Sequence, residues 1–130
     1  MVTKDLKGFG LHLTLDGYGG RHNLLADSEL VREVLDRLPQ ILRMKKISQP
    51  QVLWYDGGGK PEDCGVSGFV MIAESHIAIH TFSQKKFLTA DIYSCKWFEA
   101  EKAIVYFKEA FELKKIETEI SQRGLQFPRT

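Results

Sequence analysis

GVSGFVMIAESHIAIHTF, residues 65–82, is the stretch of sequence that decides the fold. It holds two apolar runs, Val66 to Ala73 and His76 to Phe82, both rich in β-branched and aromatic residues. Runs of this length and composition predict strands. The two predicted strands meet at Glu74-Ser75, so the middle of the chain is expected to form β-sheet.

The segments on either side continue the β pattern and add two helices. Strands are expected over Phe9 to Leu15, Gln51 to Tyr55, Phe87 to Tyr93 and Lys115 to Ser121. Apolar residues at helical spacing predict one helix after an N-cap at Asp27-Ser28, which Pro39 should kink or end, and another over Glu99 to Leu113. This order predicts an α+β two-layer sandwich, an antiparallel sheet with both helices on one face. The other face is left for solvent or a partner.

The composition is that of one small folded domain, residues 1–130. With 43% hydrophobic residues, 27% charged residues and a net charge of +1, it gives no electrostatic reason to expect a nucleic-acid partner. No apolar run approaches the ~20 residues of a membrane span, and residues 1–7 lack a signal-peptide core, so a cytoplasmic location is expected. Cys64 and Cys95 are then expected to be thiols, too few and too isolated for a metal cluster.

Four side chains with covalent chemistry lie in or just after the central block: Ser75, His76, His80 and Cys95. A nucleophilic hydroxyl or thiol near a histidine is what a covalent intermediate requires. Each residue alone has a plainer interpretation, since serine is common in turns and cysteine is a common small core residue. Only their joint order and spacing favour a catalytic role.

The joint pattern extends along most of the chain. Its motifs are Gly65-Val66-Ser67-Gly68, Glu74-Ser75-His76, His80-Thr81, Ala90-Asp91 and Cys95, with weaker matches at Gly10, His12 and Arg123-Gly124. The pattern resembles the pyruvoyl-dependent S-adenosylmethionine decarboxylases of the short, prokaryotic type. The resemblance implies a homodimeric proenzyme that cuts itself between Glu74 and Ser75, giving a β chain (1–74) and an α chain (75–130).

The same resemblance implies a role for each central residue. Ser75 is the precursor of the pyruvoyl cofactor, whose carbonyl forms a Schiff base with the substrate amine. Ser67 and His80 assist processing, with His80 transferring a proton, and Cys95 is the proton donor in catalysis. His80 follows Ser75 by five residues, an odd spacing that puts the two side chains on opposite faces of a regular strand. A turn or bulge near Ser75 is therefore expected.

The substrate-binding positions depart from the family pattern. Gln84 stands where the family has a ribose-binding glutamate, Phe82 replaces a tryptophan, and Pro61 to Cys64 lacks the aromatic residue that stacks on adenine. Glu62 and Asp63 could instead pair with a cationic substrate. The expected reaction is decarboxylation of S-adenosylmethionine in polyamine biosynthesis. L-Arginine or L-ornithine is the alternative substrate, and a non-catalytic family member is the third possibility.

Overall fold

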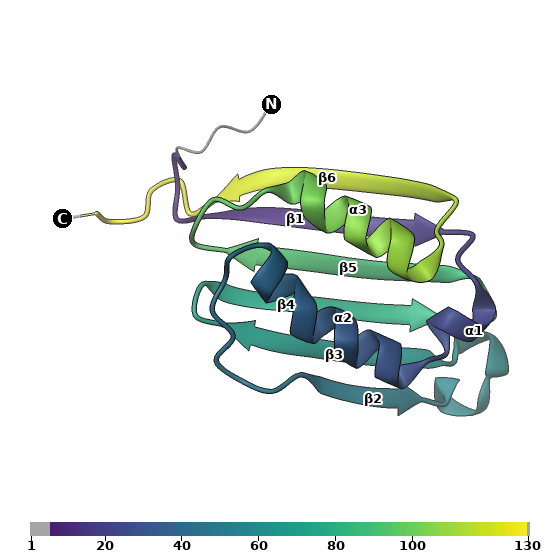
Figure 1. The fold of residues 1–130 in the computed structure, drawn as a ribbon. Helices are drawn as coiled ribbons and strands as arrows, with labels where there is room; N and C mark the ends of the chain where they lie inside the picture. Colours follow the sequence, from purple (N-terminus) through teal and green to yellow (C-terminus); the bar gives the residue numbers. More distant parts are fainter. Residues whose placement is uncertain (1–5, 130) are drawn as a thin grey trace.

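The computed structural model describes residues 6–129, and its centre is a single six-stranded sheet (Figure 1). The strands are β1 (Gly10–Tyr18), β2 (Gln51–Tyr55), β3 (Gly65–Ile72), β4 (Ser75–Phe82), β5 (Phe87–Ser94) and β6 (Lys115–Arg123). Their order is β2-β3-β4-β5-β1-β6, and all neighbours are antiparallel. The strands β3, β4 and β5 form a meander, and β1 is inserted between β5 and β6. Residues 1–5, part of the segment considered above for a signal peptide, and residue 130 lie outside the described residues.

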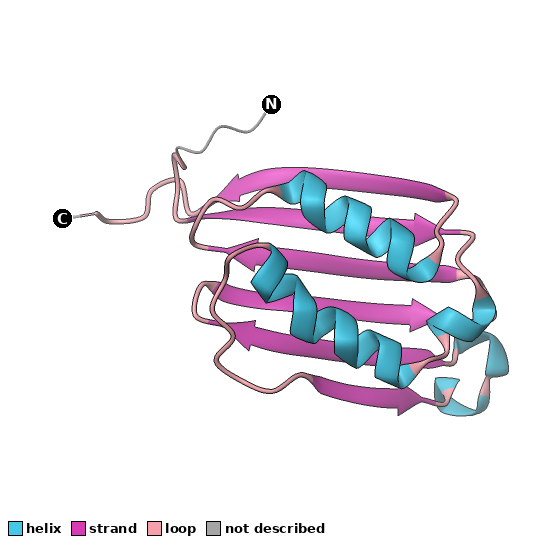
Figure 2. Ribbon diagram, viewed as in Figure 1, coloured by secondary structure: helices cyan, strands magenta, loops and turns pink. Residues whose placement is uncertain are grey.

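Two helices, α2 (Ser28–Ile41) and α3 (Ala100–Phe111), cover one face of the sheet (Figure 2). The carboxylate of Asp27 accepts hydrogen bonds from the backbone N–H groups of Glu29 and Leu30, so it is the N-cap of α2 as expected. Pro39 lies inside α2, and the helix ends soon afterwards at Ile41. This position fits a residue that cannot donate a helical hydrogen bond.

The hydrophobic core lies between the helices and the sheet. Alternate strand residues such as Leu13, Val70 and Ile79 pack there against Leu35 and Phe107 of the helices, and all five are 0% exposed. The intervening strand residues point to the opposite face, because successive side chains of a strand alternate. We call that side, which neither α2 nor α3 covers, the open face.

The predicted α+β class, with two helices on one face of an antiparallel sheet, is confirmed. The strand β1 is longer than predicted because Gly17 and Tyr18 still pair with β5 and β6. The segment that joins β2 to β3 contains two 3₁₀ turns, η1 (Gly57–Gly59) and η2 (Pro61–Asp63). A short helix, α1 (His22–Leu25), was not predicted, since four residues are too few to show helical periodicity.

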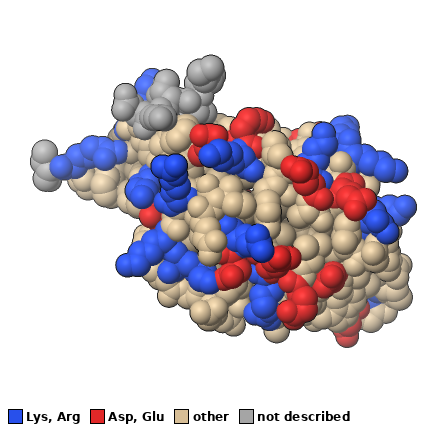
Figure 3. Space-filling view, viewed as in Figure 1, with Lys and Arg blue, Asp and Glu red and all other residues tan. Residues whose placement is uncertain are grey.

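The outer surface of the helix layer carries charges of both signs side by side (Figure 3). Arg37 lies 3.3 Å from Glu33 on α2, and Lys102 lies 3.8 Å from Glu99 at the start of α3. These side chains are more than half exposed, so solvent and salt screen the pairs. Among the described residues, no helix is long and apolar enough to cross a membrane.

Candidate active site

The turn between β3 and β4 contains the predicted cleavage site. Ile72 pairs with Ser75, so the loop consists of Ala73 and Glu74 alone. Two-residue hairpin loops usually require a positive φ at a loop residue, which glycine or asparagine supplies. Here the positive φ, +155°, falls on Ser75 instead, in a range that residues with side chains rarely adopt.

This irregularity changes the face that Ser75 reaches. Its register partners Ile72 and Ser94 are buried on the helix side of the sheet. Ser75 nevertheless lines a groove on the open face, together with His76 and His80. The local distortion expected from the odd spacing is therefore present, and it lies at the serine itself.

The carbonyl of Glu74, which precedes Ser75, is held by the residue that follows β5. The backbone N–H of Cys95 donates a hydrogen bond to this oxygen at 2.9 Å. The hydroxyl of buried Ser94 fixes the turn, donating to the Lys96 carbonyl at 2.8 Å and accepting from the Lys96 N–H at 3.0 Å. A fixed N–H directed at a carbonyl stabilises the negative charge that develops when a nucleophile adds. Glu74, Ser75 and Cys95 thus form one group.

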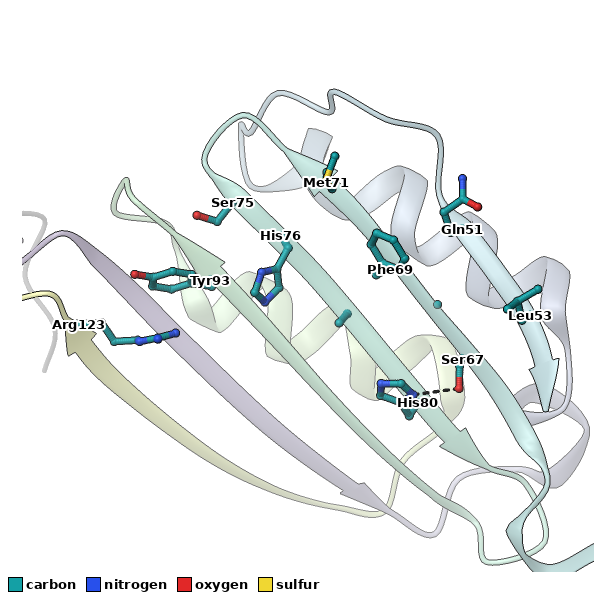
Figure 4. Close-up of a pocket in the computed structure, with 12 residues that line it drawn as sticks. Gln51, Leu53, Ser67, Phe69, Met71, Ser75, His76, His80, Tyr93 and Arg123 are labelled. Atoms are coloured by element: carbon teal, nitrogen blue, oxygen red, sulfur yellow. Dashed lines mark hydrogen bonds between the residues drawn. The ribbon is translucent and has the colours of Figure 1, made fainter. Parts of the chain in front are cut away.

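Ser67 and His80 form a second group, at the far end of β3 and β4 (Figure 4). Nδ1 of His80 and Oγ of Ser67 are 2.9 Å apart and share a hydrogen bond. Gly65 permits this pairing of the strands, because a Cβ there would lie 1.7 Å from the carbonyl oxygen of Thr81. Five residues along a strand span about 16 Å, so this pair does not reach Ser75 within one protomer.

A groove of about 1110 Å³ runs along the open face between the two groups. Its floor is mainly apolar and includes Leu53, Phe69 and Met71, which are 73%, 44% and 47% exposed. The groove is large enough for a nucleoside-sized ligand, but one protomer leaves it open to solvent.

A cluster of side chains at the groove, three of which (His76, Tyr93 and Arg123) line it, was not predicted from the sequence. His12 and His76 each place Nε2 2.9 Å from the same oxygen, Oδ2 of Asp91. Tyr93 packs against both imidazoles, and the guanidinium of Arg123 lies 4.3 Å from the centroid of the Tyr93 ring. Strand alternation could have placed these residues on one face. Their contacts depend on the register of β1, β4 and β5, which local patterns do not give.

The four predicted substrate-binding residues all lie at the Ser67–His80 end. Phe82 ends β4 and contacts Phe87 with ring centroids 5.8 Å apart, and Gln84 is exposed in the turn that follows. Glu62 is exposed in η2, and the carboxylate of Asp63 is paired with Lys85 at 3.0 Å. None of these four lines the groove of a single protomer.

Known proteins are similar to this chain in both sequence and fold. The profile of the S-adenosylmethionine decarboxylase family matches residues 11–124. The S-adenosylmethionine decarboxylase proenzyme of Clostridium botulinum strain Langeland is 32% identical over 120 residues, 92% of this chain and 97% of the relative. The proenzyme of the same name from Persephonella marina is 29% identical over 119 residues, 91% of this chain and 84% of that one. The crystal structure of the adenosylmethionine decarboxylase from Aquifex aeolicus matches with a TM-score of 0.75 and 28% identity, over 90% of this chain and 92% of that one. The chain therefore belongs to the S-adenosylmethionine decarboxylase family.

Proposed function

We propose that this protein is a proenzyme that cuts its own Glu74–Ser75 peptide bond and then decarboxylates S-adenosylmethionine. One observation carries the proposal. The Glu74 carbonyl is held by the Cys95 N–H, directly before a serine with an unfavourable φ. Stabilisation of negative charge on that oxygen and strain at the serine both favour attack by the neighbouring hydroxyl.

The cleavage needs no external reagent except water. The Ser75 hydroxyl adds to the Glu74 carbonyl carbon, the C–N bond breaks, and the hydroxyl proton passes to the nitrogen, leaving an ester and a free amine. Loss of the Ser75 Cα proton then expels the Glu74 carboxylate from Cβ. Water replaces the nitrogen, which leaves as ammonia, and the former serine becomes a pyruvoyl group. Its position fits that product, since Ser75 lines the groove and becomes the new chain end.

A second copy of the chain completes the site in this proposal. Ser67 and His80 are about 16 Å along the strand from Ser75, too far for proton transfer in one protomer. If two open faces pack with their strands antiparallel, the Ser67–His80 end of each copy meets the Ser75 end of the other. Burial of the exposed Leu53, Phe69 and Met71 supplies a driving force for this pairing.

After cleavage the chain's own residues bind and protonate the substrate. A pyruvoyl group formed from Ser75 would supply a carbonyl able to bind the substrate amine covalently and to take up the electron pair left by carbon dioxide. The Sγ of Cys95 donates a proton to the substrate carbon, as a weakly acidic thiol is able to do. The apolar floor of the groove holds the uncharged part of the substrate and excludes water.

Substrate choice depends on the Ser67–His80 end of the groove. An amide at Gln84 can still donate to and accept from ribose hydroxyls. The alternative, L-arginine or L-ornithine, depends on the acidic pair Glu62 and Asp63. Lys85 already pairs with Asp63, which makes the acidic pair a weaker partner for the guanidinium of arginine or the side-chain ammonium of ornithine. The paired lysine therefore weakens the case for L-arginine or L-ornithine.

The mass of the purified protein tests self-cleavage. We expect a fragment ending at Glu74 and a second fragment beginning with a pyruvoyl group, whereas Ser75→Ala should stay uncut. Wild-type protein that persists at full length after long incubation would refute the proposal.

Release of carbon dioxide from the three candidate substrates tests the reaction. We expect turnover of S-adenosylmethionine, with Gln84→Glu as active as wild type or more so, because a carboxylate accepts stronger hydrogen bonds from a diol. Turnover of arginine or ornithine, lost when Glu62 and Asp63 are both neutralised, would establish the alternative instead.

A further inference from the structure

The side chain of Glu74 is buried although it belongs to a two-residue surface loop. Only 9% of it is exposed, whereas its ion-pair partner Lys96 is 61% exposed. Oε1 accepts a hydrogen bond from the backbone N–H of Lys45 at 3.2 Å, and Oε2 lies 3.4 Å from Nζ of Lys96. Both carboxylate oxygens are therefore engaged, one by the chain before β2 and one by the turn after β5.

The loop is also held through its backbone on both sides. The N–H of Ala73 donates to the carbonyl of Lys45 at 2.7 Å, on the same side as the Lys45–Glu74 bond. On the opposite side the N–H of Cys95 donates to the Glu74 carbonyl. Lys96, which follows Cys95 directly, pairs with the Glu74 side chain. The carbonyl and the carboxylate of Glu74 thus contact the same short turn.

Turn stability does not explain this arrangement. A hairpin loop of this length forms most readily with Asn-Gly or Asp-Gly, which tolerate positive φ. Neither Ala73 nor Glu74 favours a positive φ, and the unfavourable φ lies on Ser75 instead. The loop also buries a carboxylate that water would otherwise solvate at no cost. All the compensating contacts converge on the residue whose carbonyl is to be attacked.

We infer that the Glu74 carboxylate and Lys96 form a positioning device for self-cleavage, a conclusion that rests on the proposed function. The device holds the Glu74 carbonyl against the Cys95 N–H while the Ser75 hydroxyl adds to its carbon. It acts on the first covalent step, in which the Ser75 Oγ–C bond forms, the C–N bond breaks and the hydroxyl proton moves to the departing nitrogen. Neither side chain exchanges a proton or an atom in that step.

The test follows the cleavage of newly synthesised protein in a cell-free system by pulse labelling. Lys96→Met removes the charge and keeps an unbranched side chain, Lys96→Arg keeps the charge, and Lys102→Met is the matched control at an exposed lysine paired with Glu99. Since small misplacements of reacting groups are worth up to about 100-fold, we expect Lys96→Met to slow cleavage by about 10- to 100-fold. Lys96→Arg should restore the rate to within about 3-fold of wild type, because the cation is kept, and Lys102→Met should cleave normally.

Two further measurements separate positioning from stability and from later steps. Lys96→Met removes one partner of the buried Glu74 carboxylate and should lower the melting temperature in the uncleavable Ser75→Ala background, so cleavage is compared at temperatures where both variants are fully folded, and the slower rate should persist there. Hydroxylamine, which cleaves esters, should cut Lys96→Met more slowly than wild type, by the same factor as in self-cleavage without hydroxylamine, since ester formation is the affected step.

An unchanged cleavage rate in Lys96→Met, or a slow rate that hydroxylamine restores fully, would overturn the inference while leaving the proposed function intact. A wild-type chain that never cuts would overturn both.

Discussion

Ser75 combines the proposed nucleophilic hydroxyl with the least favourable backbone conformation of the β3–β4 turn. Its φ of +155° lies in a range that glycine adopts far more readily than serine. Such strain is worth on the order of 1 to 3 kcal/mol and persists only where surrounding contacts impose it. In the proposed cleavage, breaking the Glu74–Ser75 bond would free φ, so the step that the strain promotes would also release it.

Replacement of Ser75 by glycine measures this strain without cleavage. Glycine in a strand is normally ~0.5–1 kcal/mol less favourable than alanine, but at residue 75 it relieves the strain. We therefore expect Ser75→Gly to be at least as stable as Ser75→Ala in urea unfolding. Ala78→Gly, made in the Ser75→Ala background within the regular part of β4, is the control and should lose the usual amount. A similar loss at residue 75 would show that the strand end is relaxed.

Cys95 should separate cleavage from decarboxylation. Cys95→Ala keeps the backbone N–H that holds the Glu74 carbonyl, so the mutant chain should still be cut. Without the thiol, turnover should fall by a factor on the order of 10² to 10⁴, the usual contribution of a positioned proton donor. Fragment masses and carbon dioxide release are measured on the same sample. Full turnover by the cut mutant would remove Cys95 from the mechanism.

At the scale of elements, the sequence predicted the strands and the two long helices because each carries its own local signal. The alternation of β3 to β5 and the Asp27 cap are properties of neighbouring residues, and both appear where expected. The contacts of Glu74 with Lys45 and Lys96 join segments 29 and 22 residues apart. Nothing in a local pattern specifies such contacts. The candidate nucleophile could thus be predicted, and the groups that hold it could not.

The cap of α2 gives a prediction of stability rather than activity. Asp27→Ala leaves the N–H groups of Glu29 and Leu30 without their acceptor and should destabilise the fold by ~1 kcal/mol. Urea unfolding in the Ser75→Ala background measures the loss, so that cleavage does not complicate the transition. Ser28→Ala, next to the cap, is the control and should change stability much less. Equal losses at both positions would show that the cap bonds are not the cause.

At the scale of the whole molecule, the two groups of candidate catalytic residues lie at opposite ends of one groove. In the proposed mechanism, a single chain would therefore carry two half-sites and no complete one. The exposed apolar floor between them is the surface that a second copy would cover. The dimer proposed above would form two sites, each with Ser75 from one chain and His80 from the other.

Mixing two inactive chains tests this arrangement. His80→Ala alone should stay uncut, and so should Ser75→Ala. Co-expressed, they should form mixed dimers in which the intact His80 of the Ser75→Ala chain faces the intact Ser75 of the other. Only the His80→Ala chain should then be cut, as mass spectrometry would reveal. A partner with both substitutions is the control and should restore nothing. Cleavage of His80→Ala by itself would show that His80 is dispensable for cleavage.

The strand order also determines how the proposed cleavage would change the kinetic stability of the protein. The first fragment would hold β1, β2 and β3, and the second β4, β5 and β6, yet β1 lies between β5 and β6 while β3 borders β4. The two pieces would thus be joined along three ladders and would remain together after the cut. Once unfolded, however, they would have to find each other again, so refolding of the cut protein should slow on dilution. The uncut Ser75→Ala protomer folds as one chain. The proposed cleavage would thus convert a protein that can refold as one chain into a two-chain protein whose lifetime depends on slow unfolding.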